Sequence, residues 1–336
     1  MTSWPFSRFR QRSRLADSVD ISGSRASIPK SGVNKYRATS KFCHLDLASF
    51  CTQYGCSTAR EMVLGVAKGT RMEPGTPSEP EPTPSDGSRD WSELPLDALV
   101  LVFARLGPVE ILMGSGLVCH SWLQAAKEPS LWASLDMSNH RAIEEMHAGV
   151  LREMARVAVD RSKGRLEAFS GKYFVTDELL KHISARSSSA SLRSLSLVSC
   201  NEVTNKGFTE LVTHAPRLED LSLELCPNVG GRHVFESAGR ACPRLRRFSL
   251  RRECFRFSLN YSRRTAEALG IAAAMPGLRS LTLVSCNINN DELAAVVEGC
   301  PRLETLCLRD CYKVIADGSL RAKCAGIRTL TLPDRV

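Results

Sequence analysis

Apolar and polar positions follow two different periods along this chain, and the first of them marks a short helical region. Within residues 96–106 only Asp97 and Arg105 are charged, so the helix that Pro95 is placed to begin is apolar on nearly every side. Such a helix needs partners on more than one face. A module of about 45 residues rarely buries enough surface to be stable alone. Residues 91–137 are therefore predicted to use their surplus apolar surface to bind another protein.

A second pattern, of the form LxxLxL, recurs through the C-terminal half of the chain. Successive units are spaced by 26, 26, 27, 33, 25 and 24 residues. One short strand and one helix per unit, stacked as a solenoid, account for this period. The alternating leucines are predicted to face the core, with the residues between them facing outwards. The units start at Leu166, Leu192, Leu218, Leu245, Leu278, Leu303 and Ile327.

Residues 91–137 resemble the F-box motif nearly end to end, and residues 116–132 are most similar to plant members. In that family three short helices dock onto a Skp-type adaptor, which bridges to a cullin, a RING protein and a ubiquitin-conjugating enzyme. Ala98 departs from the family pattern, as does an extra residue between Leu106 and Val118. The alternative is a buried helical hairpin in a larger all-α domain. The resemblance implies adaptor contacts for Leu94, Pro95, Leu99, Val102, Phe103, Leu106, Ile111, Leu112, Val118, Cys119, Trp122, Leu131 and Trp132.

Cysteines recur in step with the repeated units. Cys200, Cys226, Cys286 and Cys311 each lie eight residues after the first residue of a unit, and Cys242, Cys300 and Cys324 lie in the turns before the next. This pattern resembles the cysteine-containing subclass of leucine-rich repeats, which is common in F-box proteins. The small thiols are expected to fill tight turns and satisfy backbone groups there. Catalysis by them is not expected, because equivalent positions lie about 4.8 Å apart in a row.

These patterns predict an α/β protein with an N-terminal three-helix F-box at 91–137 and a short leucine-rich-repeat solenoid at 165–336. Parallel strands are expected on the concave face and helices on the convex face. A helix over 142–160 is expected to link the two regions, within residues 138–164. Further helices are predicted to start at Thr176-Asp177, Thr204-Asn205 and Asn290-Asp291. Six and a half repeats give a sheet of roughly 30 Å. Such an arc is too short to close around a small hormone or cofactor, so a protein or peptide ligand is expected.

The N-terminal region differs from the rest in composition. Residues 1–71 contain 12 lysines and arginines against 4 acids and so carry +8 of the chain's net charge of +9. Nucleic-acid binding by the folded part is therefore not indicated, since only +1 remains for it. The region lacks a sustained period and is predicted to be a disordered basic arm, with an organelle transit peptide as the alternative. Residues 72–90, with five prolines and five acids, are predicted to be an extended linker, and Met72 is a candidate start.

Localisation and chemistry follow from what the chain lacks. No apolar run approaches the ~18 residues of a membrane span, and the first residues have no apolar signal-peptide core. The nucleus or cytoplasm is expected, with reduced thiols. Cys43, His44, Cys51 and Cys56 are spaced too irregularly for a zinc knuckle, and free thiols are the favoured interpretation. Cys119-His120 cannot form a catalytic dyad, because helix neighbours project about 100° apart. No catalytic residue, metal or cofactor is predicted.

The concave face is predicted to be shallow, because its central row is Ser170, Ser196, Ser222, Ser249, Thr282 and Cys307. Acidic and basic residues flank that row and are the candidate substrate-binding residues; the alternative is intramolecular ion pairing between neighbouring strands. They are Glu219, Asp220, Glu224, Arg246, Arg247, Arg251 and Arg252. The fourth unit is 33 residues long, and its insertion within 251–264, where Glu253 replaces the expected cysteine, is either a binding loop or a longer surface loop.

The function predicted from these observations is that of a non-catalytic substrate receptor in a Skp, cullin and F-box ubiquitin ligase. The adaptor would bind the F-box, and the repeats would bind an unidentified protein. The alternative is a repeat scaffold that binds the adaptor or another partner without directing ubiquitination. No degron or modification can be inferred from the residues.

Overall fold

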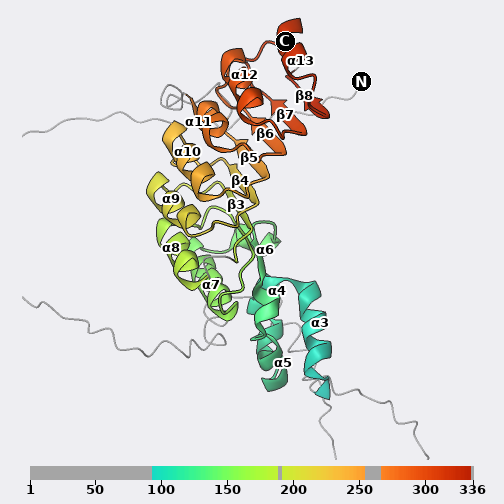
Figure 1. The fold of residues 1–336 in the computed structure, drawn as a ribbon. Coiled ribbons are helices and arrows are strands. Elements are labelled where there is room, and N and C mark those ends of the chain that lie inside the picture. Colours follow the sequence, from blue (N-terminus) through green and yellow to red (C-terminus); the bar gives the residue numbers. More distant parts are fainter. Residues whose placement is uncertain (1–92, 188–190, 254–265, 334–336) are drawn as a thin grey trace, which may run out of the picture. The chain divides into compact units, whose positions relative to one another are not determined.

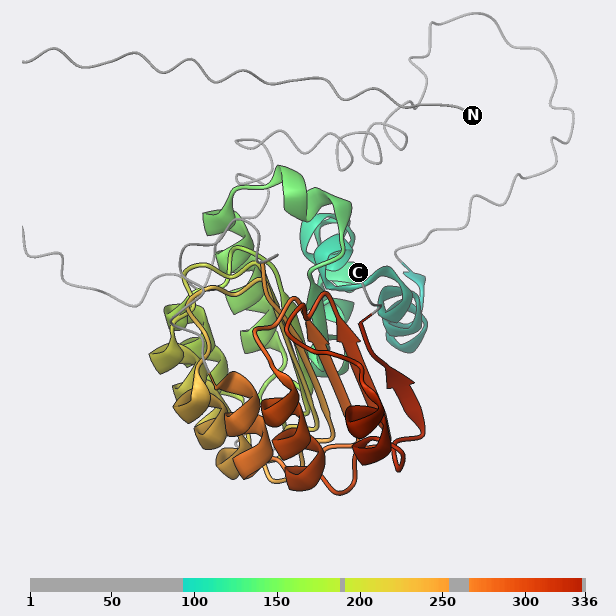
Figure 2. The ribbon, with the colours of Figure 1, turned by 90° about the horizontal axis from the view of Figure 1, so that it is seen from above.

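The computed structural model describes residues 93–187, 191–253 and 266–333. The basic arm, the linker with Met72, the four irregularly spaced zinc candidates and the fourth-unit insertion beyond Glu253 lie outside the described residues. Eight parallel strands form one sheet in chain order, with helices along one of its faces (Figures 1 and 2). The strands are β1 (Ser134–Met137), β2 (Ala168–Gly171), β3 (Ser194–Val198), β4 (Asp220–Glu224), β5 (Arg247–Arg251), β6 (Ser280–Val284), β7 (Thr305–Arg309) and β8 (Thr329–Thr331).

The helices fall into two groups that match the predicted regions. The F-box contains α3 (Leu96–Leu106), α4 (Pro108–Met113) and α5 (His120–Ala125), with single 3₁₀ turns η2 (Ser115–Leu117) and η3 (Pro129–Trp132). The predicted α/β architecture, an F-box followed by a solenoid, is confirmed. The remaining helices are α6 (Arg141–Glu145), α7 (Ala148–Arg161), α8 (Asp177–Arg186), α9 (Asn205–Thr213), α10 (Arg232–Ala241), α11 (Glu267–Ala274), α12 (Asn290–Gly299) and α13 (Gly318–Lys323).

The strand register follows the leucine pattern. Leu195, Leu221, Phe248, Leu281 and Leu306 are paired in one row across the sheet, and all are buried. Burying one such side chain stabilises the fold by about 1.5–3 kcal/mol. The next position of each strand forms the predicted central row of small polar residues, from Ser170 through Ser196, Ser222, Ser249 and Thr282 to Cys307.

The end of the predicted F-box also forms the first strand of the sheet. Ser134–Met137, within the region predicted as F-box, is β1 and pairs in parallel with β2. Eight strands, rather than the predicted seven, give a sheet of about 34 Å at ~4.8 Å per strand. The linking segment is also two helices and not one, because His140 caps α6 and His147 caps α7 through their side chains. Since α7 packs against α8, it is the first helix of the solenoid.

Predicted helix starts are confirmed to within one residue. Thr176 and Thr204 are the N-caps of α8 and α9, and each side chain accepts a hydrogen bond from a backbone N–H in the first turn. The third cap is Asn289, one residue before the predicted position, and it forms a capping box with Glu292. Such caps satisfy backbone donors that a helix end otherwise leaves unpaired.

Buried cysteines fill the turns after the strands, as predicted. The thiol of Cys226 donates to the carbonyl of Leu197 on the preceding strand at 3.5 Å, and that of Cys311 donates to Leu283 at 3.6 Å. The residue before each of the four cysteines that follow a strand has a left-handed backbone, which residues other than glycine seldom adopt. These residues are Ser199, Leu225, Ser285 and Asp310, with φ of 52–54°.

One hydrophobic core continues from the F-box into the solenoid. Trp132 is fully buried, its indole N–H donates to the carbonyl of Ala126 at 3.0 Å, and the guanidinium of Arg161 from α7 lies 5.2 Å from its ring centre. His140 Nε2 also lies 2.8 Å from a Glu110 carboxylate oxygen of α4. Within the described ranges, no helix is both long and apolar enough to cross a bilayer.

Candidate functional site

Helix α3 presents more apolar surface than the F-box can bury. The core takes Leu99 and Phe103, which lie one turn apart on one face. Leu101, which is 71% exposed, projects about 160–200° away from those two residues at 100° per position. Six of the eight large exposed apolar side chains in the described part of the chain lie within residues 96–118 and are here called the F-box apolar surface. They are Leu96, Leu101, Val102, Leu106, Leu117 and Val118.

The residues predicted to contact an adaptor divide by exposure. Pro95, Val102, Leu106 and Val118 are exposed, and Leu94, Cys119, Trp122 and Leu131 are half-buried. The remaining predicted contact residues are buried in the core of the F-box. In this conformation they support the exposed surface but are not exposed themselves. These core residues are Leu99, Phe103, Ile111, Leu112 and Trp132.

Three exposed residues were missed by motif matching: Leu96, Leu101 and Leu117. Helical periodicity holds the signal for Leu101, since it lies opposite the buried pair Leu99 and Phe103. The F-box apolar surface is not covered by the solenoid, because α4 and η3 form the packing against β1 and α7. The alternative of a hairpin buried in an all-α domain is therefore contradicted.

Ion pairs between neighbouring strands occupy most of the predicted concave charges. Asp220 on β4 pairs with Arg247 on β5, while Arg193 lies 4.0 Å from Glu219. The hydrogen bond from Arg247 to Asp220 raises the pKa of that guanidinium. Glu224 also lies 4.0 Å from Arg251. The alternative interpretation, intramolecular pairing, is what the structure contains. Such exposed pairs contribute little to stability.

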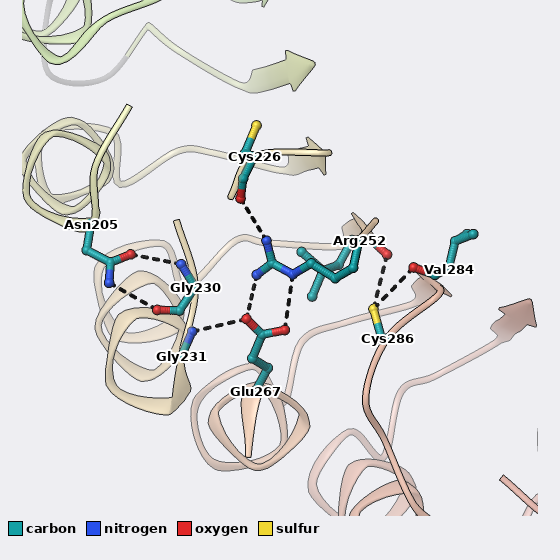
Figure 3. Close-up of polar contacts among 9 residues, drawn as sticks. Asn205, Cys226, Gly230, Gly231, Arg252, Glu267, Val284 and Cys286 are labelled. Carbon is teal, nitrogen blue, oxygen red and sulfur yellow. Dashed lines mark hydrogen bonds and ion pairs between the residues drawn. The ribbon is translucent and has the colours of Figure 1, made fainter. Parts of the chain in front are cut away.

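Arg252 is not a surface residue, contrary to the prediction that it binds substrate. Its side chain is 5% exposed, and Figure 3 shows it facing Glu267 of α11. Two of its nitrogens donate to the Glu267 carboxylate at 2.5 and 3.2 Å, and a third donates to the Cys226 carbonyl at 2.9 Å. Glu267 also accepts from the Gly231 N–H at 3.2 Å. The buried pair holds the fourth repeat together and is unavailable to a partner.

Three buried cysteines of the solenoid, Cys242, Cys300 and Cys311, have the properties of packing residues. Burial raises the pKa of Cys242 to about 12 and that of Cys300 to about 11. Burial raises the pKa of Cys311 to about 11 as well. A thiol is a poor nucleophile far below its pKa. In the described portion of the chain, no three His, Cys, Asp or Glu side chains converge as a metal site.

A groove of about 660 Å³ lies at the C-terminal end of the solenoid, between the turn after β7 and the segment after β8. We call it the end groove. It was not predicted, because its walls come from the edge of the last repeat and not from a repeated position. The lining residues are Leu308, Arg309, Asp310, Tyr312, Val314, Ile315, Ala316, Thr331, Leu332 and Pro333.

Two family models match this chain. Residues 91–138 match the model described as F-box-like. Residues 233–334 match the model described as "FBD-associated F-box protein At5g56370, LRR repeats". The first match covers α3–α5 and β1, and the second covers the sheet from β5 onwards together with the end groove.

Similar curated proteins come from Arabidopsis thaliana. F-box protein SKIP19 is 37% identical over 238 residues, which cover 70% of this chain and 74% of that protein. Putative F-box/LRR-repeat protein 22 is 38% identical, with 70% and 74% covered. Putative F-box/LRR-repeat protein 23 is 36% identical over 236 residues, or 70% of this chain, and the match spans about half (51%) of that relative's length.

Proposed function

We propose that this chain, which belongs to the plant F-box/leucine-rich-repeat proteins, is a substrate-recognition subunit of a Skp, cullin and F-box ubiquitin ligase. In this role the F-box binds a Skp-type adaptor, and the repeats bind the protein to be ubiquitinated. The subunit itself is non-catalytic: it brings two proteins together, and the chemistry belongs to its partners. The nucleus or cytoplasm, where such a complex would meet intracellular proteins, is the proposed location.

The F-box apolar surface is the single observation that carries the proposal. Isolated exposed apolar residues are common on proteins, but six large ones within residues 96–118 are a concentration typical of an interaction site. The exposure of the four that lie on α3 follows from the composition of this helix, whose apolar residues outnumber the positions that the small core can accept. A groove-forming helical partner would remove this surface from water.

An adaptor-binding experiment tests the proposal at two exposed residues. Val102→Asp and Val118→Asp place charges on the F-box apolar surface without entering the core, so each is expected to weaken binding of a purified Skp-type adaptor by tenfold or more. Ile315→Asp is the matched control, since Ile315 is equally apolar and exposed but lies in the end groove. Binding that is unchanged in both F-box variants would contradict the proposal.

The alternative function is a scaffold that binds the adaptor without directing ubiquitination. The two differ in what happens to a bound protein when adaptor binding is lost. For a ubiquitin ligase subunit, proteins captured by proximity labelling should have longer lifetimes in cells carrying Val102→Asp. Unchanged lifetimes for all captured proteins would favour the scaffold. The point variant is preferable to deletion of residues 91–137, which would also remove β1.

A further inference from the structure

The edge of the sheet where the strands begin carries a surplus of cations. Each repeat passes from its helix to its strand through a short turn at this edge, and the turns before the third to sixth units lie entirely within the described residues. Four arginines in these turns are exposed, and their side chains form no ion pair or hydrogen bond with any other residue that the structure describes. We call them the arginine rim: Arg217, Arg244, Arg246 and Arg302.

The two carboxylates in the same turns lie beside other arginines. Backbone hydrogen bonds of 2.7–2.8 Å align one position of successive turns in a row, in the order Arg193, Glu219, Arg246, Arg279 and Glu304. Along this row Glu219 lies 4.0 Å from Arg193, and Glu304 lies 3.3 Å from Arg279. Arg246 lies between these two pairs and has no carboxylate of its own. The positive charge of the rim is therefore not neutralised within the described part of the chain.

Closed turns hold the backbone of three rim arginines. Each of the three follows a proline directly, and the N–H of the next residue donates to the carbonyl of the residue before the proline. These bonds join Leu218 to Ala215 at 3.0 Å, Leu245 to Cys242 at 3.1 Å and Leu303 to Cys300 at 3.1 Å. Proline favours the second position of such a turn because its φ is already set. The arginines therefore project from a fixed backbone, which lowers the entropy lost when they bind.

A position without a side chain separates two of these arginines. The turn before the fifth unit has the same hydrogen bond but carries Gly277 where its neighbours carry Arg244 and Arg302. Those two arginines lie two repeats apart, or about 10 Å at ~4.8 Å per strand. Acidic side chains three residues apart in a polyproline II chain lie about 9 Å apart on one face. The rim therefore matches the spacing of carboxylates in an extended peptide.

The pattern of charge favours an acidic protein segment over a nucleic acid or a membrane. A nucleic acid carries a phosphate at every nucleotide and binds best to a continuous basic surface. Glu219 and Glu304 interrupt the rim, and residues 72–336 carry only +1, the chain's +9 less the +8 of residues 1–71. In the described ranges, the large exposed apolar side chains lie in the F-box apolar surface and the end groove, so the rim has none to insert into a bilayer.

We propose that the arginine rim binds an extended acidic segment of the substrate protein, with carboxylates about three residues apart. Two carboxylates pair with Arg244 and Arg302, and Arg217 and Arg246 extend the attractive field along the same edge. The segment crosses the beginnings of the strands and leaves the concave face, with its strand-to-strand ion pairs, uncovered. The inference rests on the proposed function, which makes the solenoid the substrate-binding part.

A fluorescent peptide of repeated Glu-Pro-Pro units tests the site, because its glutamates recur every three residues. Fluorescence anisotropy with the full chain measures its affinity. The double change Arg244→Ser, Arg302→Ser should weaken binding by about tenfold, as expected for the loss of two exposed charge pairs. The control pair Lys206→Ser, Arg309→Ser removes the same charge from exposed cations at the other end of their repeats, in the first turn of α9 and at the end of β7. It should change affinity by less than about twofold.

Photo-crosslinking locates the bound peptide on the chain. A photoreactive group at the centre of the peptide should label residues 243–246 and 301–304, which peptide mass spectrometry identifies. Labelling there should disappear in the rim variant and persist in the control. Residues 1–71 are the same in both variants, so any binding of the peptide to their positive charge contributes equally. Equal thermal midpoints would show that both variants are folded.

Several results would overturn the site. An equal loss in the control pair would show that the peptide responds to net charge alone. A peptide of the same composition with contiguous glutamates that binds as tightly would contradict the spacing. Tighter binding of a DNA duplex that also depends on Arg244 would make a nucleic acid the ligand. Peptide binding seen only after residues 1–90 are removed would mean that the chain's own acidic linker occupies the rim.

The adaptor test separates this inference from the proposed function. Rim variants should bind the adaptor normally, because none of the four arginines belongs to the F-box. Loss of the peptide result with adaptor binding intact would remove the rim alone. Peptide binding that persists while the adaptor test fails would keep the rim and remove the ubiquitin-ligase role.

Discussion

At the scale of single residues, Arg252 shows how a buried charge compensates for a missing cysteine. In the fourth repeat Glu253 occupies the cysteine position, and Arg252 lacks the left-handed backbone found at the equivalent residues. The guanidinium instead donates back to the Cys226 carbonyl, and Glu267 neutralises it. The pair needs Gly230, because a Cβ there would lie 2.3 Å from a Glu267 oxygen. Sequence could not predict this pairing, since Glu267 follows an insertion of unknown path.

Removing one partner of the Arg252–Glu267 pair is predicted to lower stability more than replacing both partners by apolar residues. Glu267→Ala leaves a guanidinium buried without its counter-charge and should lower the free energy of unfolding by about 3–5 kcal/mol. The double change Arg252→Met, Glu267→Leu removes both charges and should lower the free energy of unfolding by clearly less than Glu267→Ala does. Denaturant unfolding monitored by circular dichroism measures both. A double variant less stable than Glu267→Ala would contradict this account.

The raised thiol pKa values predict an order of alkylation. At pH 8 a thiol with a pKa of about 11, such as Cys311, is about one-thousandth thiolate, and burial further blocks the reagent. Among the cysteines in the described part of the chain, Cys119 and Cys307 are half-buried and should react first with iodoacetamide in native buffer. Peptide mass spectrometry measures the order, and labelling in denaturant should remove it. Native labelling of Cys311 as fast as Cys307 would show that the turn opens readily.

At the scale of elements, periodicity predicted which side chains of the strands are buried but not how neighbouring helices and turns are joined. The leucine spacing placed β2 to β8 correctly, because alternation alone decides which side chains a strand buries. The break between α6 and α7 was missed, since the caps are His140 and His147 and histidine is not among the preferred N-cap residues. The asparagine clamps were missed too: Asn205 and Asn290 each bond both backbone groups of a residue in the next turn, and each clamp depends on the path of the next repeat.

Loss of one clamp should loosen one turn. Asn290→Ala removes two hydrogen bonds to the Ile315 backbone and should lower stability by about 1 kcal/mol, with faster amide exchange in residues 311–317. Lys206→Ala, at an exposed residue in the first turn of α9, is the control and should leave that exchange unchanged. Exchange that rises equally across all repeats would mean that the clamp acts on the whole solenoid.

At the scale of the whole molecule, the sequence predicted that the F-box has an apolar surface but not which of its residues are exposed there. Motif resemblance identified the module, yet five of its marked residues, including Leu99 and Trp132, form the core. A motif records which residues matter and does not separate those that bind from those that support. The end groove had no sequence signal, because its lining comes from the irregular edge of the last repeat and not from a repeated position.

The continuous core predicts that F-box and solenoid unfold together. Trp132 joins α7 to the F-box, and Trp132→Ala should lower the free energy of unfolding by about 3–5 kcal/mol through loss of packing. Amide exchange should increase in α3 and in β2 alike. A variant in which only α3 exchanges faster would show that the F-box opens independently.

Strand β1 also limits how this protein can be re-engineered. A chimera that exchanged the F-box at residue 137 would carry away Ser134–Met137 and leave β2 as a bare edge of the sheet. A graft that places another F-box on this solenoid must instead be cut before Ser134, and it must also restore a tryptophan opposite Arg161.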